Sequence, residues 1–366
     1  MAYQQFQVTG PFDGLVDNMP APNKAPNAFD DMLNFVSRKG RLQTRPRLND
    51  FGAPQDGAIV RNMLTFEDIV DSFHTLVLTT QHGYYLNNGG TYNELTLPGG
   101  ITDLSLPSNL SLPFGMCNLI NRVYFSNGGQ RVMYTDGSAD VQFAGDVPGA
   151  ARFMCTLASH LLLGYTTEPE PGVTGSTEQT FRLRWSVPGD PNDWTSFGSG
   201  FEDVLEVPDR ITGLVTLGRN AYLFRKNGIS IISPTGDGLA PFAIENFSIS
   251  PKGVGNTYPY ALAIYANVCA FVSSSEIFHF NGVELQPIGG KAKKRIFTDL
   301  AAASNADVVT AYIVPNMGLS YDYLSYWLCI PGPNVAWVYS FDDQNWQPFD
   351  FLGGGRATFV GNAATV

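Results

Sequence analysis

The sequence predicts an all-β protein: a β-propeller of six blades, with a seventh left open, preceded by an extended N-terminal arm. Short strands end in Asn-Gly turns such as Asn227-Gly228 and Asn281-Gly282, which are typical of two-residue hairpins because type I′ turns need positive φ at both positions. Groups of three or four such strands recur at a period of about 40–50 residues, as in propeller blades. Charged residues are only 15% of the chain and aromatic residues are 13%, which suits many short strands joined by tight turns.

Residues 1–50 are predicted to form the arm. Prolines punctuate this segment, and it has no alternating pattern, so it must lie along its own body or on a neighbouring subunit. A short helix is expected over residues 27–36, because Asn27 can cap it and Gly40 can end it. The residues expected to dock the arm are Phe29, Leu33 and Val36, which would share one helix face, together with Arg45 and Pro46.

Residues 51–366 are predicted to form the propeller. The first strands of six successive units are placed near residues 74, 118, 158, 214, 262 and 308. Residues 51–73, or the tail from Arg356, could supply a seventh blade or close the ring. Another all-β architecture and a division into separate domains stay open. Helix is expected to be minor and, outside the arm, confined to residues 293–304.

Composition and charge exclude several classes of protein. The chain has 22 Lys and Arg residues against 33 Asp and Glu, a formal net charge of −11. This charge argues against a protein that grips nucleic acid over its whole surface, although nucleic acid could still slide past it. The start of the chain does not resemble a signal peptide, and no apolar stretch reaches the roughly 18 residues of a transmembrane helix. Free, buried thiols are expected at the four cysteines, Cys117, Cys155, Cys269 and Cys329.

No catalytic, cofactor or metal site is predicted. The four histidines, His74, His82, His160 and His279, lack metal-ligand spacing, and the common nucleophile and phosphate-binding motifs are absent. A propeller glycosidase with two inward-facing carboxylates stays open as an alternative. The candidates for that pair are Glu168, Glu170, Glu202, Asp203, Asp209, Asp342 and Asp343. Glu168 and Glu170 are expected in a long loop, which is a poor support for a pair at fixed separation.

Two turns place Asp and Asn just before a tryptophan. They run from Asp190 to Trp194 and from Asp342 to Trp346, and they resemble Asp-box-like hairpin turns. In such turns the Asp side chain accepts hydrogen bonds from turn amides, and the Trp packs between sheets. We therefore expect a structural role for these four residues.

One cationic cluster interrupts the acidic sequence. It consists of Lys291, Lys293, Lys294 and Arg295. Such a cluster could contact a phosphate backbone or an acidic neighbouring subunit. A solvated connection between two blades is the alternative interpretation.

Two phrases of the sequence resemble virion propellers of bacteriophage tails. Residues 35–46, FVSRKGRLQTRP, are similar to the end of the arm in those proteins, where a basic-Gly-x-Leu-x-x-Arg-Pro phrase precedes the first blade. Residues 184–194, RWSVPGDPNDW, are similar to a recurrent mid-propeller phrase. The resemblance covers the whole organisation, an arm followed by blades.

The resemblance implies a structural virion protein that is not an enzyme and binds no cofactor. Its relatives would be tail-nozzle, tail-hub and packaged-DNA-stabilisation proteins of short-tailed phages, assembled in the host cytoplasm. They form a hexameric ring below the portal and adaptor, through which DNA passes without sequence-specific binding. This chain is shorter than many of them and lacks a large insertion between blades, so its position in the tail stays open. The rival functions are a glycan-binding propeller and, second, a propeller glycoside hydrolase.

Overall fold

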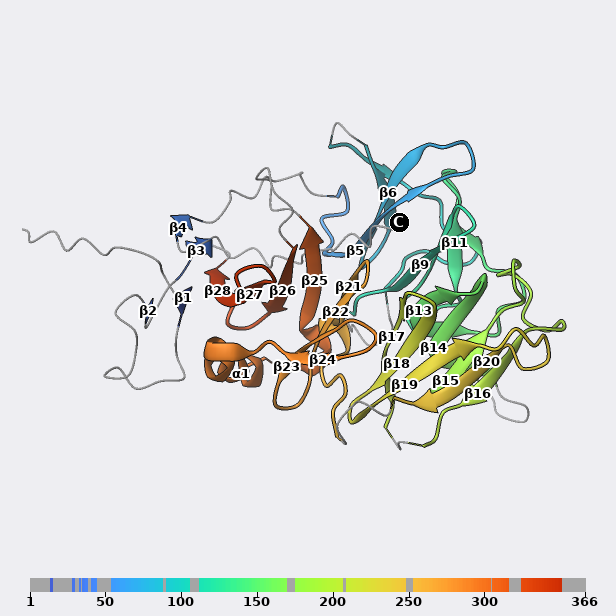
Figure 1. The fold of residues 1–366 in the computed structure, drawn as a ribbon. Coiled ribbons are helices and arrows are strands. Elements are labelled where there is room, and N and C mark those ends of the chain that lie inside the picture. The colour runs from blue at the N-terminus through green and yellow to red at the C-terminus, as the bar shows by residue number, and fades with distance from the viewer. Residues whose placement is uncertain are drawn as a thin grey trace, which may run out of the picture.

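The computed structural model has six four-stranded antiparallel sheets arranged as the blades of a β-propeller (Figure 1). The residues that the structure describes are 14–15, 28–29, 33, 35–38, 41–44, 54–87, 90–105, 112–169, 175–206, 209–247, 253–303, 305–315 and 324–350. Each blade uses four consecutive strands, in the order of the sequence. The predicted fold class is therefore confirmed, with six blades.

The blades follow one another along the chain. Blade 1 comprises β5 (Val60–Glu67), β6 (Phe73–Thr79), β7 (Gly83–Leu86) and β8 (Tyr92–Glu94), and blade 2 comprises β9 (Gly115–Leu119), β10 (Arg122–Ser126), β11 (Met133–Thr135) and β12 (Gln142–Phe143). Blade 3 comprises β13 (Ala150–Leu157), β14 (His160–Pro169), β15 (Ser176–Trp185) and β16 (Gly200–Asp203), and blade 4 comprises β17 (Ile211–Leu217), β18 (Asn220–Arg225), β19 (Gly228–Pro234) and β20 (Phe242–Asn246). Blade 5 comprises β21 (Ala263–Tyr265), β22 (Val268–Val272), β23 (Ile277–Phe280) and β24 (Leu285–Pro287), and blade 6 comprises β25 (Thr310–Pro315), β26 (Leu324–Ile330), β27 (Val335–Ser340) and β28 (Asn345–Asp350).

Two expected blade starts were wrong. Blade 1 begins at Val60, so the strand expected to open it near residue 74 is its second strand, and residues from the 51–73 segment supply the first. Blade 3 likewise begins at Ala150. In blade 1 the turn before Phe73 lacks an Asn-Gly or Asp-Gly pair, so the strongest hairpin signal was missing there.

The arm contains short strands where a helix was expected. Within residues 27–36, β2 (Ala28–Phe29) pairs in parallel with β1 (Gly14–Leu15), and β3 (Phe35–Arg38) pairs antiparallel with β4 (Arg41–Thr44). The helix prediction is therefore wrong at these residues. Arg38 pairs with Arg41, which is the register of two antiparallel strands and not of a helix end. Backbone pairing overrode the weak helical periodicity.

Strand β28, the outer strand of blade 6, has the arm beside it. Both β1 and β3 approach β28, and Figure 1 shows β1 to β4 gathered on that side of the propeller. The described strands of the arm therefore lie at the rim of the propeller, beside its outermost strand.

Among the residues that the structure describes, helical structure is confined to the connections. The expected helix is confirmed as α1 (Lys293–Ala301), between blades 5 and 6, with 3₁₀ turns η3 (Gly290–Ala292) before it and η4 (Ala306–Val308) after it. A further 3₁₀ turn, η2 (Pro259–Ala261), leads into blade 5. No helix in the described part of the chain is long and apolar enough to cross a membrane.

The core lies between neighbouring blades. Strand β27 illustrates why: Trp337 and Tyr339 join the cluster shared with blade 5, whereas Ala336 and Val338 point to the other face. Side chains alternate between faces along a strand, so an apolar strand can cover two blade faces at once. Each Å² of apolar surface buried in this way contributes about 25 cal/mol.

Candidate functional site

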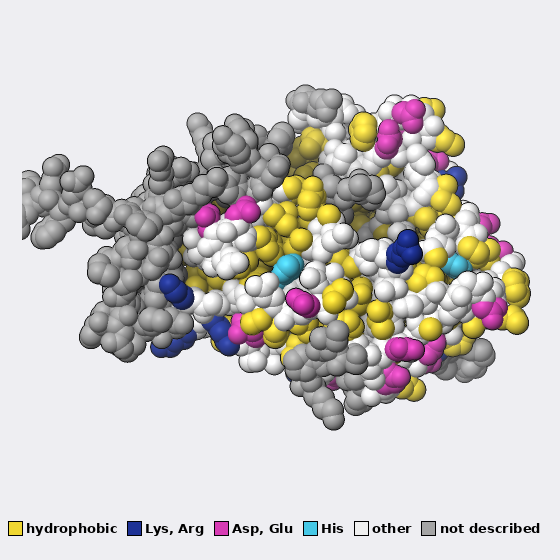
Figure 2. All heavy atoms as spheres, in the orientation of Figure 1, with side chains coloured by type: hydrophobic (Ala, Val, Ile, Leu, Met, Phe, Trp, Pro, Cys, Tyr) yellow, Lys and Arg dark blue, Asp and Glu magenta, His cyan; other side chains and the backbone are white. Residues whose placement is uncertain are grey.

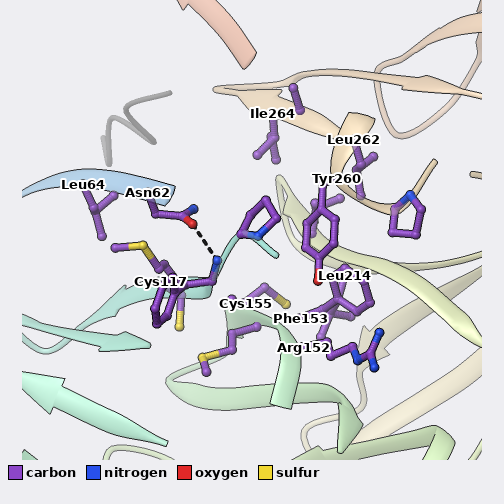
Figure 3. A pocket seen from close by; sticks show the side chains of 18 of the residues that line it. Asn62, Leu64, Cys117, Arg152, Phe153, Cys155, Leu214, Tyr260, Leu262 and Ile264 are labelled. Atoms are coloured by element: carbon purple, nitrogen blue, oxygen red, sulfur yellow. Dashed lines mark hydrogen bonds between the residues drawn. The ribbon is translucent and has the colours of Figure 1, made fainter. Parts of the chain in front are cut away.

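A cavity of about 340 Å³ lies in the central channel of the propeller. It is lined by the first strands of all six blades, so every blade contributes to it. Figure 3 shows Leu64, Leu214, Leu262 and Ile264 around the cavity. Asn62 accepts a hydrogen bond from the amide of Phe114 at 2.5 Å across the boundary between blades 1 and 2.

Arg152 is the charged residue among those that line this channel. Its guanidinium lies 3.2 Å from Glu178 Oε1 and 4.2 Å from the centre of the Tyr165 ring. The Tyr165 hydroxyl donates to Glu178 Oε2 at 2.9 Å. Nearby, Arg210 pairs with Asp307 at 3.1 Å. The charge of Arg152 is thus balanced within the chain, and the channel itself offers mainly apolar surface.

The carboxylates considered for glycosidase chemistry lie elsewhere. Glu202 and Asp203 are on β16, the outer strand of blade 3, and Asp209 accepts hydrogen bonds from Asn227. Asp342 and Asp343 lie in the turn before β28. None of them lines the described channel, and Glu170 lies outside the described residues.

Glu168 is not in a loop as expected. It is buried in β14 and lies 2.8 Å from Arg184 and 3.3 Å from Arg182. Arg182 also makes two hydrogen bonds to Asp203, at 2.8 and 2.9 Å. These hydrogen bonds hold the pKa of Asp203 below its usual value, whereas burial lowers the pKa of Arg184. Each charge has an opposite partner, which is how buried ions are stabilised in a fold.

The two Asp-and-Trp turns lie between blades. Trp194 packs between blades 2 and 3 and donates to the carbonyl of Pro191 at 2.9 Å, while Asp190 accepts from the amide of Asn192 at 3.0 Å. Trp346 packs between blades 5 and 6. In that second turn the hydrogen-bonded carboxylate belongs to Asp343, which accepts from Ser340 Oγ at 3.4 Å, whereas Asp342 is exposed.

The cationic cluster lies on η3 and α1. Lys293 pairs with Glu276 at 2.8 Å, and the guanidinium of Arg295 lies 5.7 Å from the centre of the Trp337 ring. Lys291 and Lys294 are exposed. In Figure 2, Lys and Arg side chains gather at the lower left, over the place of α1 in Figure 1.

Only part of the predicted arm contact is described. Leu33 is exposed, and the backbones of Phe29 and Val36 lie in β2 and β3. Arg45 and Pro46 lie outside the described residues. The docking role of these side chains stays a prediction.

The histidines and cysteines occupy separate places. His74 lies 2.8 Å from Asp68, His82 lies 3.0 Å from Glu94, and His160 Nδ1 lies 2.6 Å from the carbonyl of Ser186. Burial lowers the pKa of His160 and His279. The cysteines are free thiols: Cys155, Cys269 and Cys329 are buried, and Cys117 is half-buried. In the part of the chain that the structure describes, no group of His, Cys, Asp and Glu is arranged to hold a metal ion.

A second feature that the sequence reasoning missed is an exposed apolar tip on blades 1 and 2. It consists of Ile69, Val70 and Phe73 around the β5–β6 turn and Ile120 in the β9–β10 turn. A usable signal was present, because Ile69 and Val70 stand between Asp68 and Asp71. Aliphatic residues are unusual in such a polar turn.

The comparisons with known proteins concern only the fold. No family model matches the chain, and no curated protein sequence is similar to it. A virginiamycin B lyase from Staphylococcus aureus is 12% identical over 84% of this chain and 88% of its own, with a TM-score of 0.46. U3-55K is 7% identical over 83% and 84%, with a TM-score of 0.47, and BamB from Moraxella catarrhalis is 12% identical over 81% and 78%, with a TM-score of 0.39. At this level of likeness, no activity, ligand or partner of these proteins is carried over to the chain.

Proposed function

We propose that the chain is a structural protein of a bacteriophage tail, whose copies form a ring that retains DNA and conducts it during ejection. The observation that carries the proposal is the organisation of the chain, in which an arm with a phage-like phrase at residues 35–46 precedes a propeller. Strands β1 and β3 of the arm lie beside β28 at the propeller rim. From the rim, a tethered arm can reach a neighbouring subunit or an adaptor ring and increase the avidity of assembly.

The DNA path in this proposal runs between copies and not through a single propeller. The cavity in the channel of one propeller encloses about 340 Å³, the volume of a cube with edges of about 7 Å, whereas the major groove of a duplex alone is about 12 Å wide. The net charge of −11 would repeat around the ring. Because each neutralised phosphate adds affinity, an acidic wall favours passage over retention by the protein surface.

The residues around the channel support a structural role over glycoside hydrolysis. A glycosidase needs an acid and a second carboxylate on opposite sides of the bond that it cleaves. The channel is lined mainly by apolar side chains and by Arg152, and Arg152 is paired with Glu178. The buried Glu168 is held between two arginines, which is the arrangement of a structural ion pair.

The experiment is mass photometry of the full chain, alone and mixed with the portal–adaptor complex of the phage that encodes it. We expect a closed ring, a hexamer by the resemblance, and its attachment to the complex. A chain that stays monomeric in both samples would contradict the proposal. Deleting residues 1–50 should abolish attachment, with the propeller still folded by circular dichroism.

The rival functions give different results. A glycan-binding propeller would retain specific sugars on a glycan array and remain a monomer or small oligomer. A glycoside hydrolase would release reducing sugar, and the release would stop when one of the candidate carboxylates, such as Glu202 or Asp209, is replaced. We expect neither signal above that of heat-unfolded protein.

A further inference from the structure

We propose that the exposed tip of blades 1 and 2 docks onto the basic face of α1 in a second copy of this chain. This inference rests on the proposed ring and names the two surfaces that would form its subunit contact. The tip is the set Ile69, Val70, Phe73 and Ile120, and the basic face is the set Lys291, Lys294, Thr298 and Ala301.

The tip exposes large apolar side chains to an unusual degree. Ile69 is 85% exposed, Val70 72%, Phe73 74% and Ile120 52%. The two turns are joined, because Asn121 Nδ2 donates to the carbonyl of Asp68 at 3.0 Å. In Figure 2, apolar and acidic side chains lie together at the upper right, beyond the place of β6 in Figure 1. Contiguous exposed apolar surface on a folded protein marks an interaction site.

The tip is also held in this exposed form. Asp68 Oδ1 accepts hydrogen bonds from the amides of Val70 at 2.8 Å and Ser72 at 2.9 Å, while Asp68 Oδ2 lies 2.8 Å from His74 Nε2. The buried carboxylate of Asp68 therefore fixes the loop that presents Ile69 and Val70 to solvent. A surface that is ordered before binding loses less conformational entropy when a partner arrives.

The backbone at Ile120 adds a second, independent observation. Its φ is +52°, a left-handed conformation that is unfavourable for a β-branched residue. An asparagine or glycine would fit this turn with less strain. Ile120 therefore carries two free-energy costs, a left-handed backbone and an apolar side chain exposed to water. Such costs are expected where a side chain contacts a partner protein.

The charge around the tip selects the kind of partner. The turns joining first to second and third to fourth strands share one end of the propeller, because the strands of each blade are antiparallel and consecutive. Acidic residues of these turns include Asp71, Asp136, Asp140, Asp237 and Glu284, and Arg219 is the basic residue among those that the structure describes there. A partner surface for this end should be basic, with room for aliphatic side chains.

The α1 face has that chemistry. It belongs to the connection from blade 5 to blade 6, at the opposite end of the propeller from the tip. Lys291, Lys294, Thr298 and Ala301 are exposed, and positions 294, 298 and 301 follow one helix face. The lysines can pair with Glu67 and Asp71, both exposed, while Ala301 leaves space for Val70 or Phe73.

Tip and basic face cannot meet within one copy, because they lie at opposite ends (Figure 1). A contact between two different surfaces of identical chains is heterologous, and it closes into a ring when the rotation between subunits permits. The geometry therefore fits the proposed assembly, and it predicts which ends of neighbouring subunits face each other.

The test is disulfide trapping between copies. The Val70→Cys and Ala301→Cys variants, which both keep the four native cysteines, are purified separately. They are then mixed with each other and oxidised mildly. We expect a covalent dimer in the mixture and none from either variant alone. The matched control is Leu239→Cys, a residue in a turn of blade 4 that is 82% exposed against 72% for Val70, and it should not join to Ala301→Cys. Cross-linking of Val70→Cys with itself, or equal yields with the control, would overturn the proposal.

A charge swap tests the same contact without cysteines. Asp71→Lys and Lys294→Glu should each raise the concentration needed for half-assembly by about tenfold, and mixing the two variants should restore assembly to near the wild-type value. The melting temperature should stay unchanged for Lys294→Glu, because Lys294 is exposed, and should fall slightly for Asp71→Lys, because the φ of Asp71 is +60°. If the wild type forms rings and the swaps have no effect, the docking inference is wrong and the proposed function stands. If the wild type never assembles, both are wrong.

Discussion

Trp346 donates a hydrogen bond of 2.6 Å from its Nε1 atom to the carbonyl oxygen of Ile288. Trp346 is the second residue of the outer strand of the last blade, and Ile288 directly follows the outer strand of blade 5. The indole ring also packs 5.2 Å from the Tyr339 ring. One side chain therefore fastens two blades by a buried hydrogen bond and by apolar packing.

Replacing Trp346 should separate these two contributions. Trp346→Phe keeps an aromatic ring but leaves the Ile288 carbonyl unpaired, and we expect a loss of about 1–3 kcal/mol in the free energy of unfolding. Trp346→Ala should lower the free energy of unfolding by about 3–5 kcal/mol. Urea unfolding followed by fluorescence measures the free energy of unfolding of both variants. The matched control is Trp185→Phe, because the buried Nε1 of Trp185 has no hydrogen-bond partner. A loss at Trp185 as large as that at Trp346 would show that the hydrogen bond is unimportant.

The sequence could predict the blades because their strands carry a local signal. Asn281-Gly282 lies in the turn between β23 and β24, and Gly282 has a φ of +89°, although the connection has four residues and Asn281 does not share the positive φ of a type I′ turn. The first strand of blade 1 was missed because its turn at Asp68–Ser72 is held by side-chain hydrogen bonds and not by glycine. The role of Glu168 was missed for another reason: its partners Arg182 and Arg184 are on the next strand, and the register across strands is not visible in a single sequence.

Glu168 should be essential for the stability of blade 3. Glu168→Gln leaves the guanidinium of Arg184 without its closest anion, and breaking a buried pair in this way costs about 3–5 kcal/mol. The comparison variant is Glu178→Gln, since Glu178 is half-exposed and pairs with Arg152. The Glu178→Gln substitution should lower the free energy of unfolding by no more than about 1 kcal/mol. Equal effects of the two substitutions in urea unfolding would refute the structural assignment of Glu168.

His160 should make the fold less stable in mild acid. Burial lowers the pKa of His160 below 6.5 in the folded chain, so the unfolded chain binds the proton more readily. The contribution of neutral His160 to the free energy of unfolding is therefore complete above about pH 6.5. It is lost as the pH falls toward the pKa of His160 in the folded chain. Unfolding free energies at pH 7.5 and 5.5 measure this loss, and His160→Gln should show a smaller difference between the two. An identical difference in the variant would assign the pH dependence to other groups.

The native cysteines should be silent toward thiol reagents. Burial raises the pKa of Cys155 and of Cys329 to about 12, so little thiolate forms near pH 8, and the thiolate is the reactive form. Labelling with a chromogenic disulfide at pH 8 should modify these thiols slowly in the folded protein and fast in denaturant. Fast native labelling would contradict the described burial.

Ile120 should trade stability for assembly. Ile120→Asn places a residue that tolerates left-handed backbone at a φ of +52°, and we expect the isolated chain to gain about 0.5–1 kcal/mol in unfolding free energy. Removing an apolar side chain from the tip should at the same time raise the concentration for half-assembly. The matched control is Ala158→Asn, which relieves a similar backbone at a φ of +48° in the corresponding turn of blade 3. It should gain stability and leave assembly unchanged. If Ile120→Asn gains stability and assembles as well as the wild type, the isoleucine has no role in the contact. The docking proposal would then rest only on the exposed apolar side chains of the tip.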